Sequence, residues 1–204
     1  MEVQPLSISG SFVVTPKIFE DDRGAFLEWY RADKLEEVLG YSLDLKQANS
    51  SVSKRGVVRG IHFAELGPGQ AKYVTCPFGA VVDFIVDIRV GSPTFGKWDS
   101  VVLDDQNRKA VYLSEGLGHA FVALTENSFV NYLVSDKYRP GKEHGINPLD
   151  PDIALDLPFS VDKLSLSEKD SAAPSLAEMA HVGSLPTWEQ SMSWYEALKK
   201  DSGI

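Results

Sequence analysis

Short runs of alternating hydrophobic and polar residues, separated by turn-forming residues, fill the chain from about residue 48 to residue 136. A period of two residues is typical of a β-strand with one buried face. Strand and turn repeat at roughly ten-residue spacing, which predicts an all-β sandwich or barrel. The clearest run is residues 80–90, which places Val82, Phe84, Val86, Ile88 and Val90 on one face and Asp83, Asp87 and Arg89 on the other. We expect the first face to be core and the second to meet solvent or a polar cavity.

Two segments have features of helices. Residues 32–39 (ADKLEEVL) precede Gly40, a suitable C-cap. Residues 187–201 are predicted to form a C-terminal helix, in which Thr187 and Gln190 have the spacing of a capping box.

The amino-acid composition changes after residue 139, where Pro, Gly and Asp become frequent and predict a loop that crosses the surface. The chain contains no internal repeat and no region whose composition indicates a second domain. We therefore expect a single domain over residues 1–204, with N-terminal strands in about 1–50, the core in 51–138, and the loop and C-terminal helices in 139–204.

Composition narrows the function classes. The net charge of −9 and the lack of long basic runs count against binding to nucleic acid or to a membrane surface. The N-terminus lacks the features of a signal peptide, and no apolar run approaches the ~18 residues of a membrane span, so we expect a cytoplasmic protein. The single cysteine, Cys76, excludes an intrachain disulfide and is expected to be buried.

Several kinds of site are missing from the sequence. His62 is followed by Phe63 and Ala64 instead of a second histidine, so the HxH pattern of a metal-binding cupin is absent and we expect no metal. GxSxG, GxGxxG and P-loop patterns are also absent, so we expect no cofactor. General acid–base chemistry remains, and from spacing alone His62 is either a buried, inert histidine or a catalytic base.

Other residues carry similar alternatives. Lys72 lies in an apolar run, where its ammonium needs an anion or an opening to solvent. Arg23, Arg59 and Arg89 could bind phosphate or pair with a neighbouring aspartate. Tyr132 is either a core tyrosine or a proton donor that faces a cavity.

Five segments closely resemble the dTDP-4-dehydrorhamnose 3,5-epimerases and their relatives in antibiotic deoxysugar pathways. They occur in matching order and place the resemblance over about residues 10–175. The segments are VSKRGVVRGIHF, QAKYV, DIRVGSPTFGKWDSVVLDD, YLSEGLGHAF and LSEKD. The resemblance implies a cupin-like jelly roll without metal, a homodimer, and a dTDP-4-keto-6-deoxyhexose substrate. The reaction it implies removes a proton beside the ketone and returns one to the opposite face.

The resemblance also implies roles for residues that match the motifs. His62 would be the general base, Asp170 its carboxylate partner, Tyr132 the proton donor, and Lys72 the cation beside the 4-keto oxygen, where enolate charge develops. His119 and Asp83 would also line the pocket. The remaining matches would contact the nucleotide: Arg59 at the pyrophosphate, Tyr138 on thymine, Gln47 and Asn49 nearby, and Arg23, Phe26 and Glu28 from the partner subunit.

Two positions depart from the family pattern. Ala64 stands where many members have Gln, and Ser114 stands where Pro is usual. Because we expect both beside the sugar pocket or on its rim, the alternative to inversion at carbons 3 and 5 is inversion at only one of them. A non-catalytic cupin that binds a nucleotide sugar or a protein partner is a remoter alternative. It would need Arg59 but not the combination of His62, Asp170, Tyr132 and Lys72.

Overall fold

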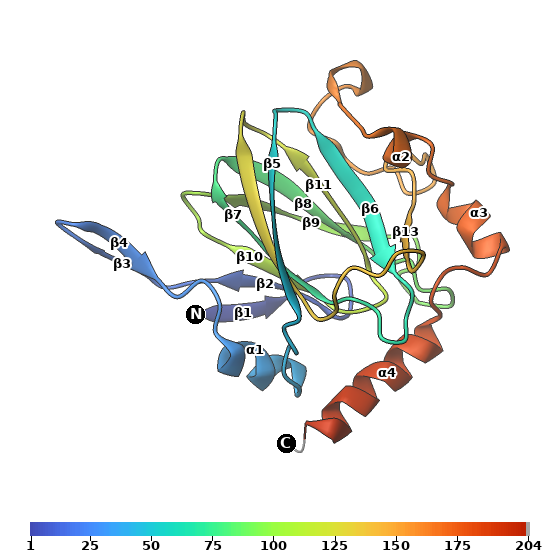
Figure 1. Cartoon of the computed structure of the whole chain (residues 1–204), viewed down its shortest axis with the longest axis horizontal. Helices are drawn as coiled ribbons and strands as arrows, with labels where there is room; N and C mark the ends of the chain where they lie inside the picture. The colour runs from blue at the N-terminus through green and yellow to red at the C-terminus, as the bar shows by residue number, and fades with distance from the viewer. Residues whose placement is uncertain (203–204) are drawn as a thin grey trace.

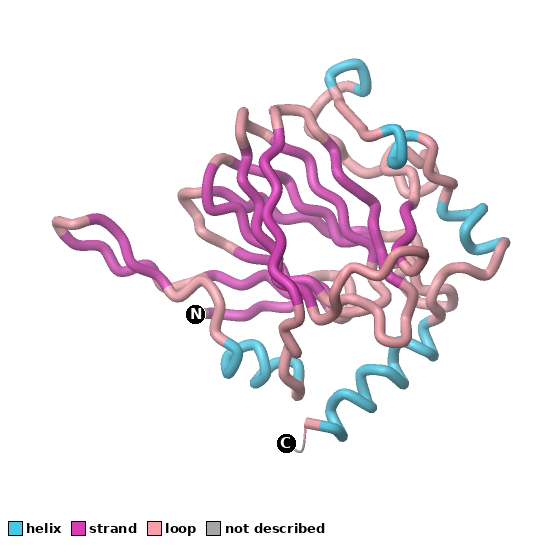
Figure 2. Tube along the Cα trace, in the orientation of Figure 1, coloured by secondary structure: helices cyan, strands magenta, loops and turns pink. Residues whose placement is uncertain are grey.

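Two antiparallel sheets face each other in a computed structural model that describes residues 1–202 (Figures 1 and 2). The six-stranded sheet has the order β1 (Glu2–Pro5), β2 (Ser11–Thr15), β10 (Ala110–Leu113), β7 (Lys72–Phe78), β12 (Ser128–Val134) and β5 (Gln47–Ser53). The five-stranded sheet has the order β13 (Glu143–Gly145), β6 (Val58–Ala64), β11 (Gly118–Ala123), β8 (Ala80–Val86) and β9 (Trp98–Asp104). Neighbouring strands are seldom consecutive in sequence, because the chain crosses repeatedly between the sheets. The predicted jelly roll is confirmed.

The helices lie outside the two sheets. They are α1 (Ala32–Leu39), α2 (Glu168–Ser171), α3 (Leu176–His181) and α4 (Trp188–Asp201), with a 3₁₀ turn at Val161–Lys163. Gly40 caps α1 in the left-handed conformation, and Thr187 and Gln190 form the predicted capping box of α4. Both helix predictions are confirmed. None of the helices in residues 1–202 is both long enough and apolar enough to cross a membrane.

Both sheets are covered on both faces. One core fills the space between them and includes Val74, Ile85 and Val130. A second packs the outer face of the six-stranded sheet against α1, and a third packs the outer face of the five-stranded sheet against the chain after residue 145. A strand buried on both faces loses the simple alternation of apolar and polar residues.

The run 80–90 shows this effect and corrects the expectation for it. Strand β8 ends at Val86, and the side that carries Asp83 also carries Val81 and Ile85, which are buried between the sheets. That side therefore faces the mostly apolar core between the sheets rather than solvent, with Asp83 as a buried polar residue within it. Beyond the strand, Asp87 and Arg89 are fully buried and form a bidentate ion pair, with both nitrogen–oxygen distances at 2.8 Å.

Arg89 is thus held in the structure and is not available to a phosphate. Val90 was expected in the core, but it is exposed because it lies beyond the end of the strand.

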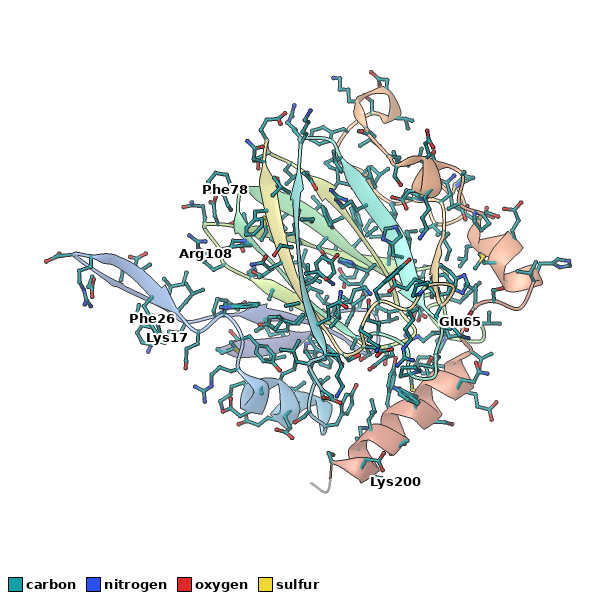
Figure 3. All side chains as sticks on the ribbon, in the orientation of Figure 1. Lys17, Phe26, Glu65, Phe78, Arg108 and Lys200 are labelled. Atoms are coloured by element: carbon teal, nitrogen blue, oxygen red, sulfur yellow. The ribbon has the colours of Figure 1, made fainter. Side chains whose placement is uncertain are left out.

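A hairpin of β3 (Ile18–Asp21) and β4 (Gly24–Leu27) projects away from the two sheets (Figures 1 and 3). Near its base, Phe19 pairs with Phe26, and their side chains are 47% and 67% exposed. Large aromatic side chains are rarely left this open on an isolated arm. The hairpin therefore has the composition of a segment that contacts another molecule.

Candidate active site

A cavity of about 360 Å³ opens between the two sheets. Residues on β5, β7 and β12 of one sheet face residues on β6, β11 and β13 of the other. The lining residues are Gln47, Asn49, Ser51, Arg59, His62, Gln70, Lys72, His119, Phe121, Tyr132, Tyr138 and Glu143. Eight of the thirteen site residues expected from the sequence are therefore brought together in one place.

An irregularity in β6 brings Arg59 and His62 to the same cavity. They are three residues apart, and a regular strand would point them to opposite faces. In the pairing with β11, however, His62 lies opposite His119 and Arg59 opposite Phe121, so three steps on β6 match two on β11. The extra residue of such a bulge re-aims the side chains on one side of it.

Gly60 makes the irregularity possible. Its φ is +127°, and a Cβ at this position would lie 2.5 Å from the Cβ of Ala120. Only glycine combines that backbone conformation with so close an approach of the neighbouring strand. A side chain at position 60 would therefore disturb the placement of both Arg59 and His62.

His62 bonds the carboxylate of Asp170, with 2.6 Å between Nε2 and Oδ1. Asp170 lies on α2, whose first turn is capped by the Ser167 hydroxyl. Its side chain is 5% exposed, whereas that of His62 is 39% exposed. The carboxylate thus holds one ring nitrogen from the protein side, and the imidazole remains open to the cavity.

The charge state of Asp170 suits this arrangement. Burial alone would raise its pKa, but hydrogen bonding with His62 and Ser167 outweighs burial and lowers the pKa below its usual value. An ionised Asp170 accepts a hydrogen bond from Nε2–H, which fixes the tautomer, and its charge stabilises the imidazolium that forms when Nδ1 takes up a proton.

His119 forms a second pair deeper in the molecule. Its Nε2 lies 2.7 Å from Oδ2 of Asp83, which is fully buried. Burial raises the pKa of Asp83, and the interaction with His119 only partly opposes this. Asp83 does not line the cavity, so its predicted role as a lining residue is wrong; it supports His119 from behind.

Lys72 enters the cavity from the start of β7. It is 7% exposed, and Nζ donates a hydrogen bond to Oε1 of Gln70. Burial lowers the pKa of Lys72 to about 8, while the carboxylates of Glu143 and Glu115 act in the opposite direction. A desolvated ammonium with unused donors can bind a developing negative charge strongly.

Tyr132 faces the same cavity from β12, on the sheet opposite His62. Burial raises its pKa, although Arg59 opposes the rise. The hydroxyl therefore keeps its proton at neutral pH. The site thus has a base on the five-stranded sheet, and a neutral proton donor and a lysine on the facing six-stranded sheet.

Comparisons with known proteins agree with this geometry. The family model described as dTDP-4-dehydrorhamnose 3,5-epimerase matches residues 5–178. The chain belongs to this family.

A dTDP-4-dehydrorhamnose 3,5-epimerase of Mycobacterium tuberculosis is 52% identical over 201 residues, which are 98% of this chain and 99% of the relative. A dTDP-4-dehydrorhamnose 3-epimerase of Streptomyces niveus is also 52% identical, over 92% of this chain and 90% of the relative. The crystal structure of ChmJ, a 3'-monoepimerase of Streptomyces bikiniensis in complex with dTDP-quinovose, superposes with a TM-score of 0.93 at 43% identity. It covers 96% of this chain and 98% of that one.

The mouth of the cavity in this epimerase-family chain carries the residues expected at the nucleotide. Oε1 of Gln47 accepts a hydrogen bond from the Tyr138 backbone at 3.1 Å, and its amide donates to Asn49 at 2.6 Å. Tyr138 is exposed. Arg59 donates to the Ser53 hydroxyl and to a carbonyl and has no carboxylate partner within residues 1–202, so its guanidinium can turn to an anion.

Three expected residues lie away from this cavity. Arg23 and Phe26 are on the projecting hairpin, and Glu28 follows it and pairs with Arg31. The side chain of Arg23 is 90% exposed and pairs with Asp21. Their predicted contact with nucleotide requires a second subunit and stays a prediction.

The sequence analysis missed four lining residues. Ser51 continues the alternation of Gln47 and Asn49 on β5, and Phe121 and Gln70 lie two residues from His119 and Lys72. Two-residue spacing could have identified these three. Glu143 had no such signal, because β13 lies inside the segment that was read as a loop.

The two departures from the family pattern lie in different places. Ala64 borders a small hollow that shares Gln70 and Glu143 with the main cavity, so it is next to the site as expected. Ser114 is buried beside Gly10 and does not line the cavity, so its expected place at the pocket is wrong.

The remaining candidates for other chemistry take structural places. Cys76 is buried, as expected, and burial raises its pKa to about 11. His144 bonds Glu65 at 2.9 Å. Residues 1–202 contain no cluster of three or more His, Cys, Asp or Glu side chains placed to hold a metal ion.

Proposed function

We propose that this protein is an epimerase that inverts carbons 3 and 5 of a dTDP-4-keto-6-deoxyhexose without a cofactor. The observation that carries the proposal is the His62–Asp170 pair, open to a cavity whose facing wall presents the protonated hydroxyl of Tyr132. A base on one side of a sugar ring and an acid on the other is the arrangement that inversion requires.

The reaction takes place in three steps. His62 removes the proton from a carbon next to the ketone, while Asp170 stabilises the imidazolium. The electron pair moves to the ketone oxygen, where the ammonium of Lys72 stabilises the enolate; such a positioned charge in a dry site lowers a barrier by several kcal/mol, about 3 in measured cases. Tyr132 then donates a proton to the opposite face of the same carbon.

The nucleotide is expected to bind at the mouth of the cavity. Arg59 can hold the diphosphate, Tyr138 can stack on thymine, and Gln47 and Asn49 offer polar groups beside them. The relative with bound dTDP-quinovose supports this class of ligand.

The protein is proposed to act as a homodimer in which the hairpin residues Arg23 and Phe26, followed by Glu28, reach the partner's nucleotide. The exposed aromatic residues of the β3–β4 hairpin support this proposal.

A complementation experiment tests the homodimer proposal: His62→Asn and Arg23→Ala chains are unfolded together, refolded and assayed. If each site uses the partner's hairpin, mixed dimers contain one intact site, and about one quarter of wild-type activity returns. No gain over the separate variants would contradict the exchange.

Inversion at carbon 3 alone is the second candidate. A 3-epimerase relative is as identical to this chain as a 3,5-epimerase relative, and Ala64 lies beside the hollow next to the site. Proton NMR of dTDP-4-keto-6-deoxyglucose incubated with the protein in D2O separates the two. Deuterium at both carbons supports the 3,5-epimerase, and deuterium at one supports the monoepimerase. The absence of uptake under conditions where the protein is folded would contradict both.

A further inference from the structure

Glu115 is a buried carboxylate next to the active site that the reaction above does not use. It is 5% exposed, and it lies in the loop between β10 and β11. One of its carboxylate oxygens, Oε2, is buried without a hydrogen-bond partner among the described residues. A buried, incompletely satisfied carboxylate is expensive, so its surroundings are informative.

The other oxygen connects Glu115 to the strand that carries Lys72. Oε1 accepts a hydrogen bond of 3.1 Å from the Ser135 hydroxyl. That hydroxyl accepts a 2.8 Å hydrogen bond from the backbone N–H of Ala71. The carboxylate is therefore linked through one hydroxyl to the backbone N–H of Ala71, the residue before Lys72.

The strand register supports the same placement. Lys72 is flanked by Leu113 of β10 on one side and Val134 of β12 on the other. Glu115 and Ser135 follow these two neighbours within two residues, so both emerge at the level where β7 begins. In the loop between β6 and β7, Gly69 packs so closely against Glu115 that a Cβ at position 69 would lie 2.8 Å from the Cβ of Glu115.

Among the described residues, Lys72 is the cation whose charge acts on Glu115. Burial disfavours the charge on both side chains, and each charge stabilises the other. Glu143, which lines the cavity with Lys72, also raises the pKa of Lys72, and it does so more strongly than Glu115. The other titratable groups that line the cavity with Lys72 are Arg59 and His62 on β6, His119 on β11, Tyr132 on β12, and Tyr138 after β12.

We propose that Glu115 is a positioning residue for the epimerisation: through Ser135 it fixes the start of β7, and its negative charge keeps Lys72 protonated to meet the enolate. Gln70 also helps to position Lys72, because it accepts a hydrogen bond from Lys72 and donates one of 3.0 Å to the carbonyl of Asp136. The inference deepens the proposed function and rests on it for the role of Lys72.

The charge can be removed with little change of shape. Glu115→Gln keeps an oxygen for Ser135 and loses the charge, while Glu115→Asp keeps the charge. Tyr195→Phe is the matched control, because the Tyr195 hydroxyl donates to the backbone carbonyl of Glu115 and its removal leaves the carboxylate in place.

The first measurement needs no substrate. NMR of protein labelled with ¹³C at lysine Cε follows the titration of Lys72, whose signal is the one missing from Lys72→Met. We expect Glu115→Gln to move the titration down by about one pH unit. Glu115→Asp and Tyr195→Phe should leave it near the wild-type position. An unchanged titration in Glu115→Gln would overturn the proposal.

The second measurement is the pH profile of deuterium exchange from D2O. The alkaline limb of kcat should move to lower pH in Glu115→Gln and stay in place in Tyr195→Phe. If Glu115→Gln does not fold, Ser135→Ala decides the question, since loss of the bridge should shift the Lys72 titration in the same direction and an unchanged titration would count against it. Failure of wild type to exchange would contradict the proposed function, whereas exchange with an unchanged profile in Glu115→Gln would contradict only this inference.

Discussion

His62 and His119 are direct partners in the pairing of β6 with β11, and each bonds an aspartate through Nε2. The two distances, 2.6 Å to Asp170 and 2.7 Å to Asp83, are almost the same. The surroundings differ. The His62 side chain is 39% exposed and that of His119 is 9% exposed, and the pKa of Asp170 is lowered while that of Asp83 is raised.

This difference shows that a histidine–aspartate contact does not define a role. His62 has one nitrogen fixed by an ionised carboxylate and an open ring that can accept and release a proton. His119 is enclosed, and Asp83, whose pKa is raised, stabilises a positive charge on His119 only while Asp83 itself is ionised. We therefore assign proton transfer to the first pair and support of the cavity wall to the second.

The largest difference between the pairs should follow from their aspartates. Asp170→Asn removes the acceptor that fixes the His62 tautomer and stabilises the imidazolium, so kcat should fall by about 10³-fold with little change in KM. Steady-state kinetics on dTDP-4-keto-6-deoxyglucose measures both constants. Asp162→Asn, in the exposed 3₁₀ turn, is the control and should match wild type.

The same substitution in the second pair should have a smaller effect. Asp83→Asn leaves the His62–Asp170 pair intact and changes only the group behind His119, so we expect a loss of about tenfold in kcat. The same assay measures it. A loss as large as that of Asp170→Asn would mean that both pairs transfer protons and would remove the distinction drawn here.

The two pairs should change the pH dependence of folding stability in opposite directions. The lowered pKa of Asp170 stabilises the fold above the unfolded value of 3.8, and this contribution is lost as pH falls through the lower folded value. The raised pKa of Asp83 stabilises the fold at pH values below the unfolded pKa of 3.8. This stabilisation is lost as pH rises through the higher pKa of the folded state.

Urea unfolding from pH 2.5 to 6 measures these slopes. Relative to wild type, Asp170→Asn should regain stability as pH falls, and Asp83→Asn should regain it as pH rises, each by about 1 kcal/mol. Slopes of the same sign in the two variants would contradict the assigned charge states.

Local signals in the sequence predicted the parts of the fold that depend on local interactions. The caps at Gly40 and Thr187 located two helices because capping involves residues within one turn. The all-β class followed from short alternating runs. The burial of Asp87 with Arg89 did not follow, because it depends on distant segments such as α4, whose Trp188 ring lies 4.6 Å from the Arg89 guanidinium.

The site was less accessible to pattern reasoning. Asp170 lies 108 residues after His62, and the bulge that turns Arg59 and His62 to one side depends on contact between Gly60 and Ala120. Only resemblance to a family could join these positions in advance. Glu143 and Glu115 escaped notice because their places are set by β13 and by the ends of neighbouring strands.

Deuterium uptake by matched His62→Asn and His119→Asn variants distinguishes the histidine that transfers the proton from the one that supports the wall. Both are incubated with dTDP-4-keto-6-deoxyglucose in D2O, and proton NMR follows exchange at carbons 3 and 5. We predict that His62→Asn slows exchange at both carbons by about 10³-fold or more, whereas His119→Asn retains it at a reduced rate. Undiminished exchange in His62→Asn would show that another group removes the proton.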